Sequence, residues 1–271
     1  MNEDIREKDG ETREDPRYSA ECESDEIAVR EGETLEDLQL GGLRLIQKKQ
    51  GFRFGMDSVL LADFARIRRT DTVVDIGCGT GILPLLLIGR NKGARFLGLE
   101  IQEAMAEMAQ RTVLLNHLED RVRIICGDAA RWQEWIPPCS VDAVICNPPY
   151  GMPGQVLRNQ AETLATARHQ EKHTLSLFFA AAFRMLKGRG GIYVVYPAAQ
   201  MFSLMTELKQ QHLEPKRFRL VYPDLRRPAN LVLLEAVKDA RPRLHPMPPL
   251  IIFQENGILT KELESIYHRE E

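Results

Sequence analysis

The sequence predicts an α/β fold built on a doubly wound, mostly parallel sheet. Short apolar runs typical of buried strands alternate with longer segments typical of helices, and glycine-rich or polar turns separate the two. Strands are expected at residues 72–76, 95–99, 122–126, 142–146, 191–196, 217–222 and 230–237. Helices are expected at residues 57–66, 80–90, 102–116, 174–187 and 199–211.

Individual elements follow from local patterns. The first strand is the apolar run Thr72–Val74, and the helix after it begins with the apolar run Ile82–Ile88. Residues 95–99 and 142–146 are apolar runs of strand length, which indicates burial within the sheet. The glycine-rich segment Lys187–Gly191 is interpreted as a helix stop and a turn into the fifth strand.

The chain is expected to have three parts. Residues 1–37 hold 15 acidic and 5 basic residues and few large apolar ones, so we expect a disordered acidic tail. Residues 38–238 form the single globular domain, and residues 239–271 are a proline-rich extension that packs on this core. Without the tail, the remaining chain carries a net charge of +7. That charge suits a polyanionic partner, although a solvated basic surface explains it too.

Composition also excludes several classes of protein. An apolar run of about 18 residues and a signal pattern are both absent, which predicts a cytoplasmic protein without a membrane span. The five cysteines form no C-x-x-C pair, and the six histidines are scattered. We therefore expect free thiols in a reducing compartment and no metal site.

A glycine loop follows the first predicted strand. Asp75 precedes Gly77, Gly79 and Gly81, and glycines at such a turn let the backbone approach a ligand closely. The G-x-G-x-G spacing differs from the dinucleotide-binding pattern, and a carboxylate at this place suits a cationic group such as the amino group of a methionine moiety. Glu100 directly follows the second predicted strand, where a carboxylate can accept from both hydroxyls of a ribose.

A second motif, Asn147–Tyr150, reads Asn-Pro-Pro-Tyr and follows the predicted strand at 142–146. The prolines keep the backbone extended with free carbonyls, and Asn147 adds a side-chain carbonyl acceptor. Tyr150 adds a flat aromatic face. These groups suit a planar molecule with an exocyclic amino group, while an ordinary turn at the end of a strand is the alternative.

Together these motifs resemble those of class I S-adenosylmethionine (SAM) methyltransferases, and more narrowly those of the bacterial tRNA(Val) adenine-N6 methyltransferases. The resemblance covers roughly residues 38 to 268. It rests on the glycine loop and on Phe52–Ala62, Gly127–Ala129, Asn147–Tyr150, Asn230–Ala236 and Gly257–Leu263. It implies a Rossmann-like class I methyltransferase sheet that ends in a C-terminal antiparallel hairpin, with SAM as cofactor and S-adenosylhomocysteine as product.

The resemblance assigns roles to site residues. Asn147, Pro148 and Tyr150 are expected to be catalytic, with Tyr150 stacking on an adenine. Asp128 is expected to accept from the adenine amino group of the cofactor, or else to cap the following turn. Asp57 is expected to shape the cofactor pocket, or else to be the N-cap of its helix. Cofactor contacts are thus expected from Asp57, Asp75, Gly77, Gly79, Gly81, Glu100 and Asp128.

The expected substrate is RNA, most specifically the adenine on the 3′ side of the anticodon of tRNA(Val), bound by a monomer. Candidate RNA contacts are Lys48, Lys49, Arg53, Arg158, Arg168, Lys216, Arg217, Arg226 and Arg227. Four alternatives remain open: protein glutamine N5-methylation, methylation of adenine in rRNA or in DNA, and RNA binding without catalysis by a module that keeps a SAM pocket. The short stretch before Asp75 disfavours the glutamine enzymes, and the short segment from Gly151 to His173 disfavours the DNA enzymes.

Overall fold

The computed structural model describes the backbone of residues 29–50, 55–149 and 160–267, and the side chains of all of these except residues 160–172. Most of this chain surrounds one nine-stranded sheet with the order β10-β8-β9-β7-β6-β3-β4-β5, while β11 also pairs with β8. Its strands are β3 (Thr72–Ile76), β4 (Arg95–Glu100), β5 (Val122–Cys126), β6 (Val141–Cys146), β7 (Leu186–Pro197), β8 (Leu213–Tyr222), β9 (Leu231–Lys238), β10 (His245–Pro246) and β11 (Leu250–Ile251).

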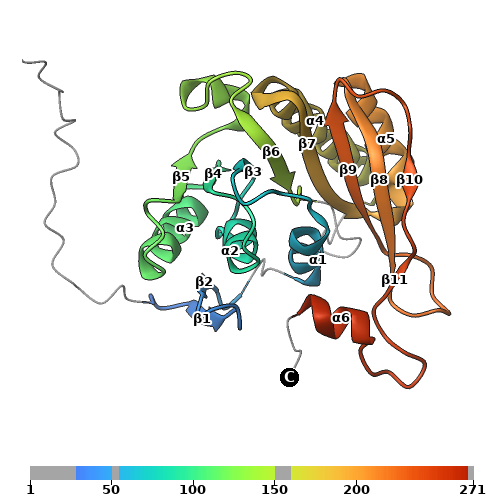
Figure 1. Cartoon of the computed structure of the whole chain (residues 1–271), viewed down its shortest axis with the longest axis horizontal. Coiled ribbons are helices and arrows are strands. Elements are labelled where there is room, and N and C mark those ends of the chain that lie inside the picture. The colour runs from blue at the N-terminus through green and yellow to red at the C-terminus, as the bar shows by residue number, and fades with distance from the viewer. Residues whose placement is uncertain (1–28, 51–54, 150–159, 268–271) are drawn as a thin grey trace, which may run out of the picture.

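The predicted fold class is confirmed. Strands β5, β4, β3, β6 and β7 pair in parallel, whereas β9 is antiparallel to both β7 and β8. The sheet is therefore mostly parallel and contains the expected antiparallel hairpin, formed by β8 and β9 (Figure 1). Because β3 lies between β4 and β6, the chain winds outward in two directions from β3, which makes the sheet doubly wound.

Helices cover both faces of the sheet (Figure 1). One apolar core joins α1 (Met56–Phe64), α2 (Ile82–Gly89), α3 (Glu103–Leu115) and α6 (Lys261–Ile266) to one face of the sheet. A second core joins α4 (Gln160–Met185), α5 (Met201–Gln210) and the 3₁₀ helix η1 (Ala129–Glu134) to the other. The short 3₁₀ helix η2 (Ala198–Gln200) leads from β7 into α5. Burial on both faces explains why the central strands are continuous apolar runs.

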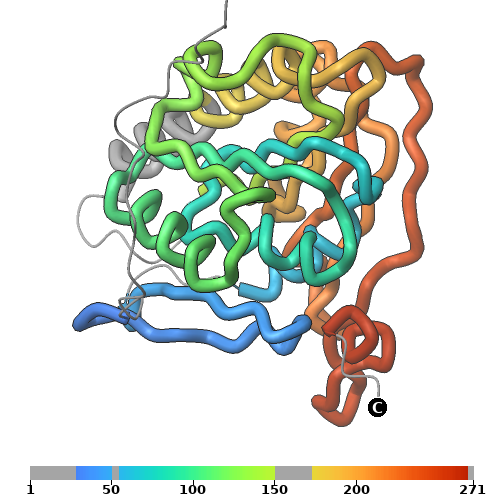
Figure 2. The backbone as a smooth tube through the Cα atoms, turned by 60° about the vertical axis from the view of Figure 1, so that its left-hand side comes forward, coloured from blue at the N-terminus to red at the C-terminus, as the bar shows by residue number. Residues whose placement is uncertain are grey.

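The boundary expected at residue 37 is wrong, because residues 33–37 are part of the folded chain. They form β1 (Glu33–Asp37), which pairs in antiparallel register with β2 (Arg44–Lys48). Figure 2 shows this hairpin at the edge of the molecule, beside the helical layer. Its acidic residues are accommodated because Arg111 of α3 binds the Glu33 carboxylate, which composition alone does not indicate. Residues 1–28 of the expected tail lie outside the described residues.

Two further boundaries differ from prediction. Helix α4 begins at Gln160, 14 residues before its expected start. The first half of this helix was not predicted, because it is polar and lacks the apolar pattern of the second half. Strand β7 begins at Leu186, so the predicted turn at residues 187–191 is wrong. The glycines of β7 lie where its register against β6 shifts, between Val141 and Ala143. Such an irregularity lets one strand hold more residues than its partner without leaving the sheet.

The proline-rich extension runs along the outer strand of the sheet. Strands β10 and β11 pair in parallel with β8, which gives the extension backbone hydrogen bonds although its prolines cannot donate. Thr260 caps α6 by accepting from the N–H of Leu263. Leu263 and Ile266 of α6 are buried in the core beside α1. In the described part of the chain, no helix is both long and apolar enough to cross a membrane.

Candidate functional site at the carboxyl edge of the sheet

The site residues predicted from sequence come from strands that are direct neighbours. Asp75 of β3 is in register with Gly98 of β4 on one side and with Ile145 of β6 on the other. The carboxyl ends of these parallel strands therefore bring the glycine loop, Glu100 and Asn147 to one edge. This edge lies at the point where the winding direction reverses, which is where open α/β sheets bind ligands.

All three glycines of the loop adopt backbone angles that other residues rarely reach. The φ angles are 73° at Gly77, 54° at Gly79 and 81° at Gly81, in the left-handed region where a Cβ atom is strained. A Cβ atom on Gly81 would also lie 3.5 Å from the Cβ of Ala109 in α3, so this glycine permits close helix packing as well. The loop is therefore set by its sequence to turn tightly from β3 into α2.

Glu100 fastens the loop to the neighbouring strand. Its Oε2 accepts from the N–H of Gly79 at 2.9 Å, and its Oε1 accepts from the N–H of Gln102 at 2.8 Å. The side chain is buried, with 5% exposure. The carboxylate predicted for ribose binding thus also positions the backbone of the glycine loop.

Asp75 is a buried carboxylate without a partner in the described chain. Its side chain is 1% exposed, and neither carboxylate oxygen has a hydrogen-bond partner. Burial and the nearby Glu100 carboxylate raise the pKa of Asp75 well above its usual range. A buried, unpaired carboxylate is costly, and a cationic ligand group beside it would offset that cost.

Asn147 is held from the side by the first turn of α1. Its Nδ2 lies 3.1 Å from Oδ2 of Asp57 and 3.3 Å from Oγ of Ser58. The N-cap of α1 is Gly55, without a side-chain cap, so the N-cap interpretation of Asp57 is wrong. Pro148 is buried, while Tyr150 lies outside the described residues. No sequence pattern predicts this contact, because Asp57 and Asn147 are 90 positions apart.

Asp128 and Ile101 also lie at the carboxyl edge of the sheet. Asp128 follows β5, and its Oδ1 accepts from the N–H of Ala130 at 2.8 Å, so the capping interpretation is correct at least for this oxygen. Ile101 follows Glu100 directly and is 66% exposed, although it is a large apolar residue. Ile101 is not among the site residues predicted from the sequence. Its position directly after Glu100, the last residue of β4, is the sequence feature that places it at this edge.

The basic candidates divide into three groups. Lys48 and Lys49 are exposed where β2 ends, and Arg226 and Arg227 are exposed in the loop between β8 and β9. That loop lies at the same edge as Asn147, because Leu231 at the start of β9 pairs with Pro197 at the end of β7. Arg53 and Arg158 lie outside the described residues, as does the side chain of Arg168, and Lys216 is half-buried in β8.

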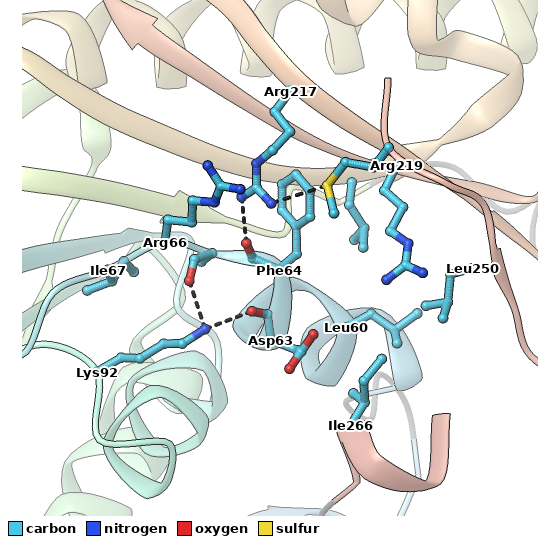
Figure 3. A pocket seen from close by; sticks show the side chains of 13 residues that line it. Leu60, Asp63, Phe64, Arg66, Ile67, Lys92, Arg217, Arg219, Leu250 and Ile266 are labelled. Atoms are coloured by element: carbon cyan, nitrogen blue, oxygen red, sulfur yellow. Dashed lines mark hydrogen bonds between the residues drawn. The ribbon is translucent and has the colours of Figure 1, made fainter. Parts of the chain in front are cut away.

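Arg217 is the exception, because it is buried in β8 with 8% exposure and cannot contact RNA. Its Nε binds Glu235 at 2.7 Å, and its guanidinium lies over the Phe64 ring, 4.0 Å from the centroid. This residue lines a cavity of about 290 Å³ at the C-terminus of α1. Figure 3 shows its side chain next to Phe64. Lys92 there donates to three backbone carbonyls of residues 62–65. These cations cap a helix end and fasten it to β8, so this cavity is structural.

Comparisons with known proteins agree with this geometry. The family model described as "Methyltransferase small domain" matches residues 54–216, which include the glycine loop, Glu100 and Asn147. The chain belongs to the methyltransferase small domain family. As a member, it is a class I SAM-dependent methyltransferase, which confirms the predicted enzyme class and cofactor.

Curated relatives of this methyltransferase share one printed name, tRNA1(Val) (adenine(37)-N6)-methyltransferase. The relative from Erwinia tasmaniensis is 31% identical over 188 residues, which cover 67% of this chain and 74% of the relative. One from Vibrio cholerae is 30% identical over 189 residues, which cover 68% and 75%. One from Bacteroides thetaiotaomicron is 29% identical over 170 residues, which cover 62% and 70%.

Solved structures support the methyltransferase fold. A protein from Agrobacterium tumefaciens described as a predicted O-methyltransferase superposes with a TM-score of 0.65 at 20% identity, covering 79% of this chain and 96% of that one. TYW2 of P. horikoshii, in complex with MeSAdo, superposes with a TM-score of 0.53 at 16% identity, covering 78% and 73%. At these identities the likeness concerns the fold alone.

The residues at the carboxyl edge fit the chemistry of SAM. Its amino group is a cation of the kind that the unpaired Asp75 carboxylate requires, and the three glycines leave the loop backbone open to a close approach. Ile101 offers exposed apolar surface next to Glu100. Among the described residues, no cluster of three or more His, Cys, Asp or Glu side chains has the arrangement of a metal site.

Proposed function

We propose that this methyltransferase transfers a methyl group to N6 of an unpaired adenine in RNA, most specifically adenine 37 of tRNA1(Val). The observation that carries the proposal is the place of Asn147. It follows β6, next to the glycine loop of β3, and its Nδ2 is directed at Asp57 and Ser58, so its carbonyl is available to a substrate amine. The shared name of the curated relatives supports the specific substrate.

Cofactor binding is assigned to four places along the edge. Asp75 pairs with the amino group of SAM, and the loop of Gly77, Gly79 and Gly81 lies against its methionine moiety. Glu100 keeps the loop in place and has lone pairs left for the ribose hydroxyls, since each of its oxygens accepts one backbone N–H. Asp128 offers its second oxygen to the adenine amino group.

The chain's contribution to chemistry is electrostatic. SAM supplies an electrophilic methyl group on a sulfonium. The Asn147 side-chain carbonyl and the Pro148 backbone carbonyl each accept one hydrogen from the adenine N6 amine. This localises the nitrogen lone pair, which otherwise delocalises into the ring, and stabilises the positive charge that N6 gains when the methyl group arrives. N6 then loses a proton to water, so a strong general base is not required.

The preference for an unpaired adenine follows from the depth of the site. Asn147 is half-buried and Pro148 is buried, so a base can reach them only after leaving its stack. Extrusion costs a few kcal/mol, and this cost is smallest for a base in a single-stranded loop. Stacking on Tyr150, worth roughly 1–3 kcal/mol, offsets it.

A methyl-transfer assay with three classes of substrate tests the proposal. The purified protein and labelled SAM are incubated with total RNA from cells that lack this enzyme, with genomic DNA, and with protein extract. We expect label in the tRNA fraction, recovered as N6-methyladenosine after nucleoside digestion. Label confined to protein would instead show glutamine methylation, and label confined to DNA or rRNA would show one of the other adenine activities. SAM binding without any transfer would contradict catalysis.

A further inference from the structure

The orientation of the Asn147 side-chain amide determines whether it can accept a hydrogen bond from the substrate amine. Its oxygen and nitrogen are interchanged by a half-turn of the side chain, and only one orientation presents a carbonyl to a substrate amine. In the structure, Nδ2 faces two acceptors, Oδ2 of Asp57 at 3.1 Å and Oγ of Ser58 at 3.3 Å. An ionised carboxylate can only accept, so the reversed amide would place two oxygens against each other. Asp57 thus favours the orientation with the carbonyl directed away from α1.

Asp57 is itself fixed by the start of α1. Its Oδ1 accepts from the N–H of Ser58 at 2.9 Å, and its place in the first turn lets the helix dipole stabilise the negative charge. Gly55 provides the space, because a Cβ atom there would lie 3.0 Å from Oδ1. The helix cannot shift easily, since Leu60 and Leu61 are buried in the core at 1% and 0% exposure.

We propose that Asp57 is a positioning residue that acts on the substrate through Asn147, and that it does not contact the cofactor. The inference rests on the proposed function, because it takes the Asn147 carbonyl as the acceptor for the reacting amine. The carboxylate has two effects: it selects the productive orientation of the amide, and its charge polarises the amide so that the carbonyl becomes a stronger acceptor. Neighbours of this kind commonly tune the groups they orient.

The Asp57→Asn variant separates this role from cofactor binding. It keeps the shape of the side chain but replaces one acceptor with a donor, so it cannot accept from both Ser58 and Asn147. We expect kcat for methyl transfer to RNA to fall about 10- to 100-fold, as for loss of a group that orients an active residue. The dissociation constant for SAM is expected to stay within about 2-fold of wild type. Asp63→Asn, at the exposed end of the same helix, is the matched control and should keep wild-type kcat.

A double-mutant cycle makes the test specific. In an Asn147→Ala background, Asp57→Asn should cause no further loss in kcat, because the group through which it acts is gone. Additive losses would overturn the proposal, and so would a 10-fold weaker affinity for SAM, which would show direct cofactor contact. If Asp57→Asn lowers stability, Ser58→Ala provides a second probe, since it removes the longer hydrogen bond and should lower kcat only about 2- to 5-fold.

A measurement on the cofactor-free protein distinguishes failure of this inference from failure of the proposed function. The side-chain amide signals of Asn147 in an NMR spectrum, assigned by their loss in Asn147→Ala, should exchange slowly in wild type and at least about 10-fold faster in Asp57→Asn. Equal exchange rates in the two proteins would contradict the contact itself. Slow exchange in a wild-type protein that transfers no methyl to RNA would refute the proposed function and keep Asp57 as the group that orients Asn147.

Discussion

Two carboxylates at the ends of neighbouring strands are held in opposite ways. Glu100 accepts from two backbone N–H groups, which stabilise its charge. Asp75 is equally buried but lacks a partner among the described residues, and burial raises its pKa well above the usual range. A cationic ligand group beside Asp75 would therefore favour its ionised form.

Asp75→Asn should remove a proton-linked part of SAM binding. In the free protein the raised pKa keeps Asp75 protonated up to a higher pH, and pairing with the SAM ammonium favours the ionised form. SAM binding should then release a proton below that pKa, and affinity should rise by up to about tenfold per pH unit as pH increases. Calorimetry in buffers of different ionisation enthalpy measures this release. If the Asn variant released as many protons as wild type, Asp75 would not be the linked group.

At the residue scale, features of the site could be predicted from the sequence where their cause lies within one short motif. The tight turn at the three loop glycines was predicted correctly, because positive φ angles favour glycine whatever surrounds the turn. The bond between Asp57 and Asn147 could not be predicted, since it joins α1 to the end of β6 across 90 positions. Arg217 was misassigned because its partner, Glu235, becomes its neighbour only when β8 and β9 pair.

At the scale of elements, a charged contact helps to fasten the hairpin of β1 and β2 to α3, together with hydrogen bonds from the N–H groups of Arg44 and Ile46 to the side chains of Asn116 and Thr112. The two terminal guanidinium nitrogens of Arg111 donate to the Glu33 carboxylate, at 2.9 Å from Nη1 and 2.5 Å from Nη2. The hydrogen bonds from Arg111, the largest contribution, lower the pKa of Glu33 below its usual value despite burial. Bidentate pairs of this kind fix geometry as well as adding energy.

Glu33→Gln should lower the free energy of unfolding by about 1–2 kcal/mol at pH 7, because it removes a partly buried charged pair. Since the folded pKa is depressed, the contribution of Glu33 is complete above the unfolded pKa of about 4.3 and is lost as pH falls through the folded value. Denaturant unfolding should thus give a clear difference at pH 7 and a smaller one at pH 3. Glu31→Gln, at an exposed position beside the hairpin, is the control; an equal loss there would argue against the pair.

The elements themselves were largely predictable from apolar runs. The seven predicted strands correspond to β3 through β9, because burial on both faces makes a central strand apolar throughout. The elements that were missed are short or largely polar: the β1–β2 hairpin, the first half of α4, the two-residue strands β10 and β11, the 3₁₀ helices η1 and η2, and α6. Their stability comes from partners elsewhere in the chain, which composition does not reveal.

At the scale of the whole molecule, the two edges of the sheet carry different sets of residues. The carboxyl edge carries the glycine loop, Asn147 and the exposed loop of Arg226 and Arg227. The opposite edge carries a second cavity, of about 660 Å³, which is lined by both basic and acidic residues. Lys187 pairs with Asp142 there at 2.7 Å. RNA binding is therefore expected at the carboxyl edge.

Lys49→Ala and Arg226→Ala should each weaken binding to tRNA and make it less dependent on salt. Each substitution removes one phosphate contact, so the slope of log K against log salt concentration should become shallower by about 1. Arg68→Ala, at the opposite edge, should leave the slope unchanged. The measurement is a series of binding titrations at increasing salt. If Arg68→Ala changed the slope more than the other two substitutions, the RNA would bind at the opposite edge, which would contradict this expectation.

The most direct test of the central claim is the turnover number of Asn147→Ala at saturating SAM and tRNA. Loss of one preorganised dipole that acts only as charge develops should lower kcat by about 10²- to 10³-fold. The dissociation constant for SAM should stay close to that of wild type, because Asn147 is assigned to the substrate amine. A variant that keeps near-full turnover would show that the Asn147 carbonyl does not activate the amine, and this account of the site would then be wrong.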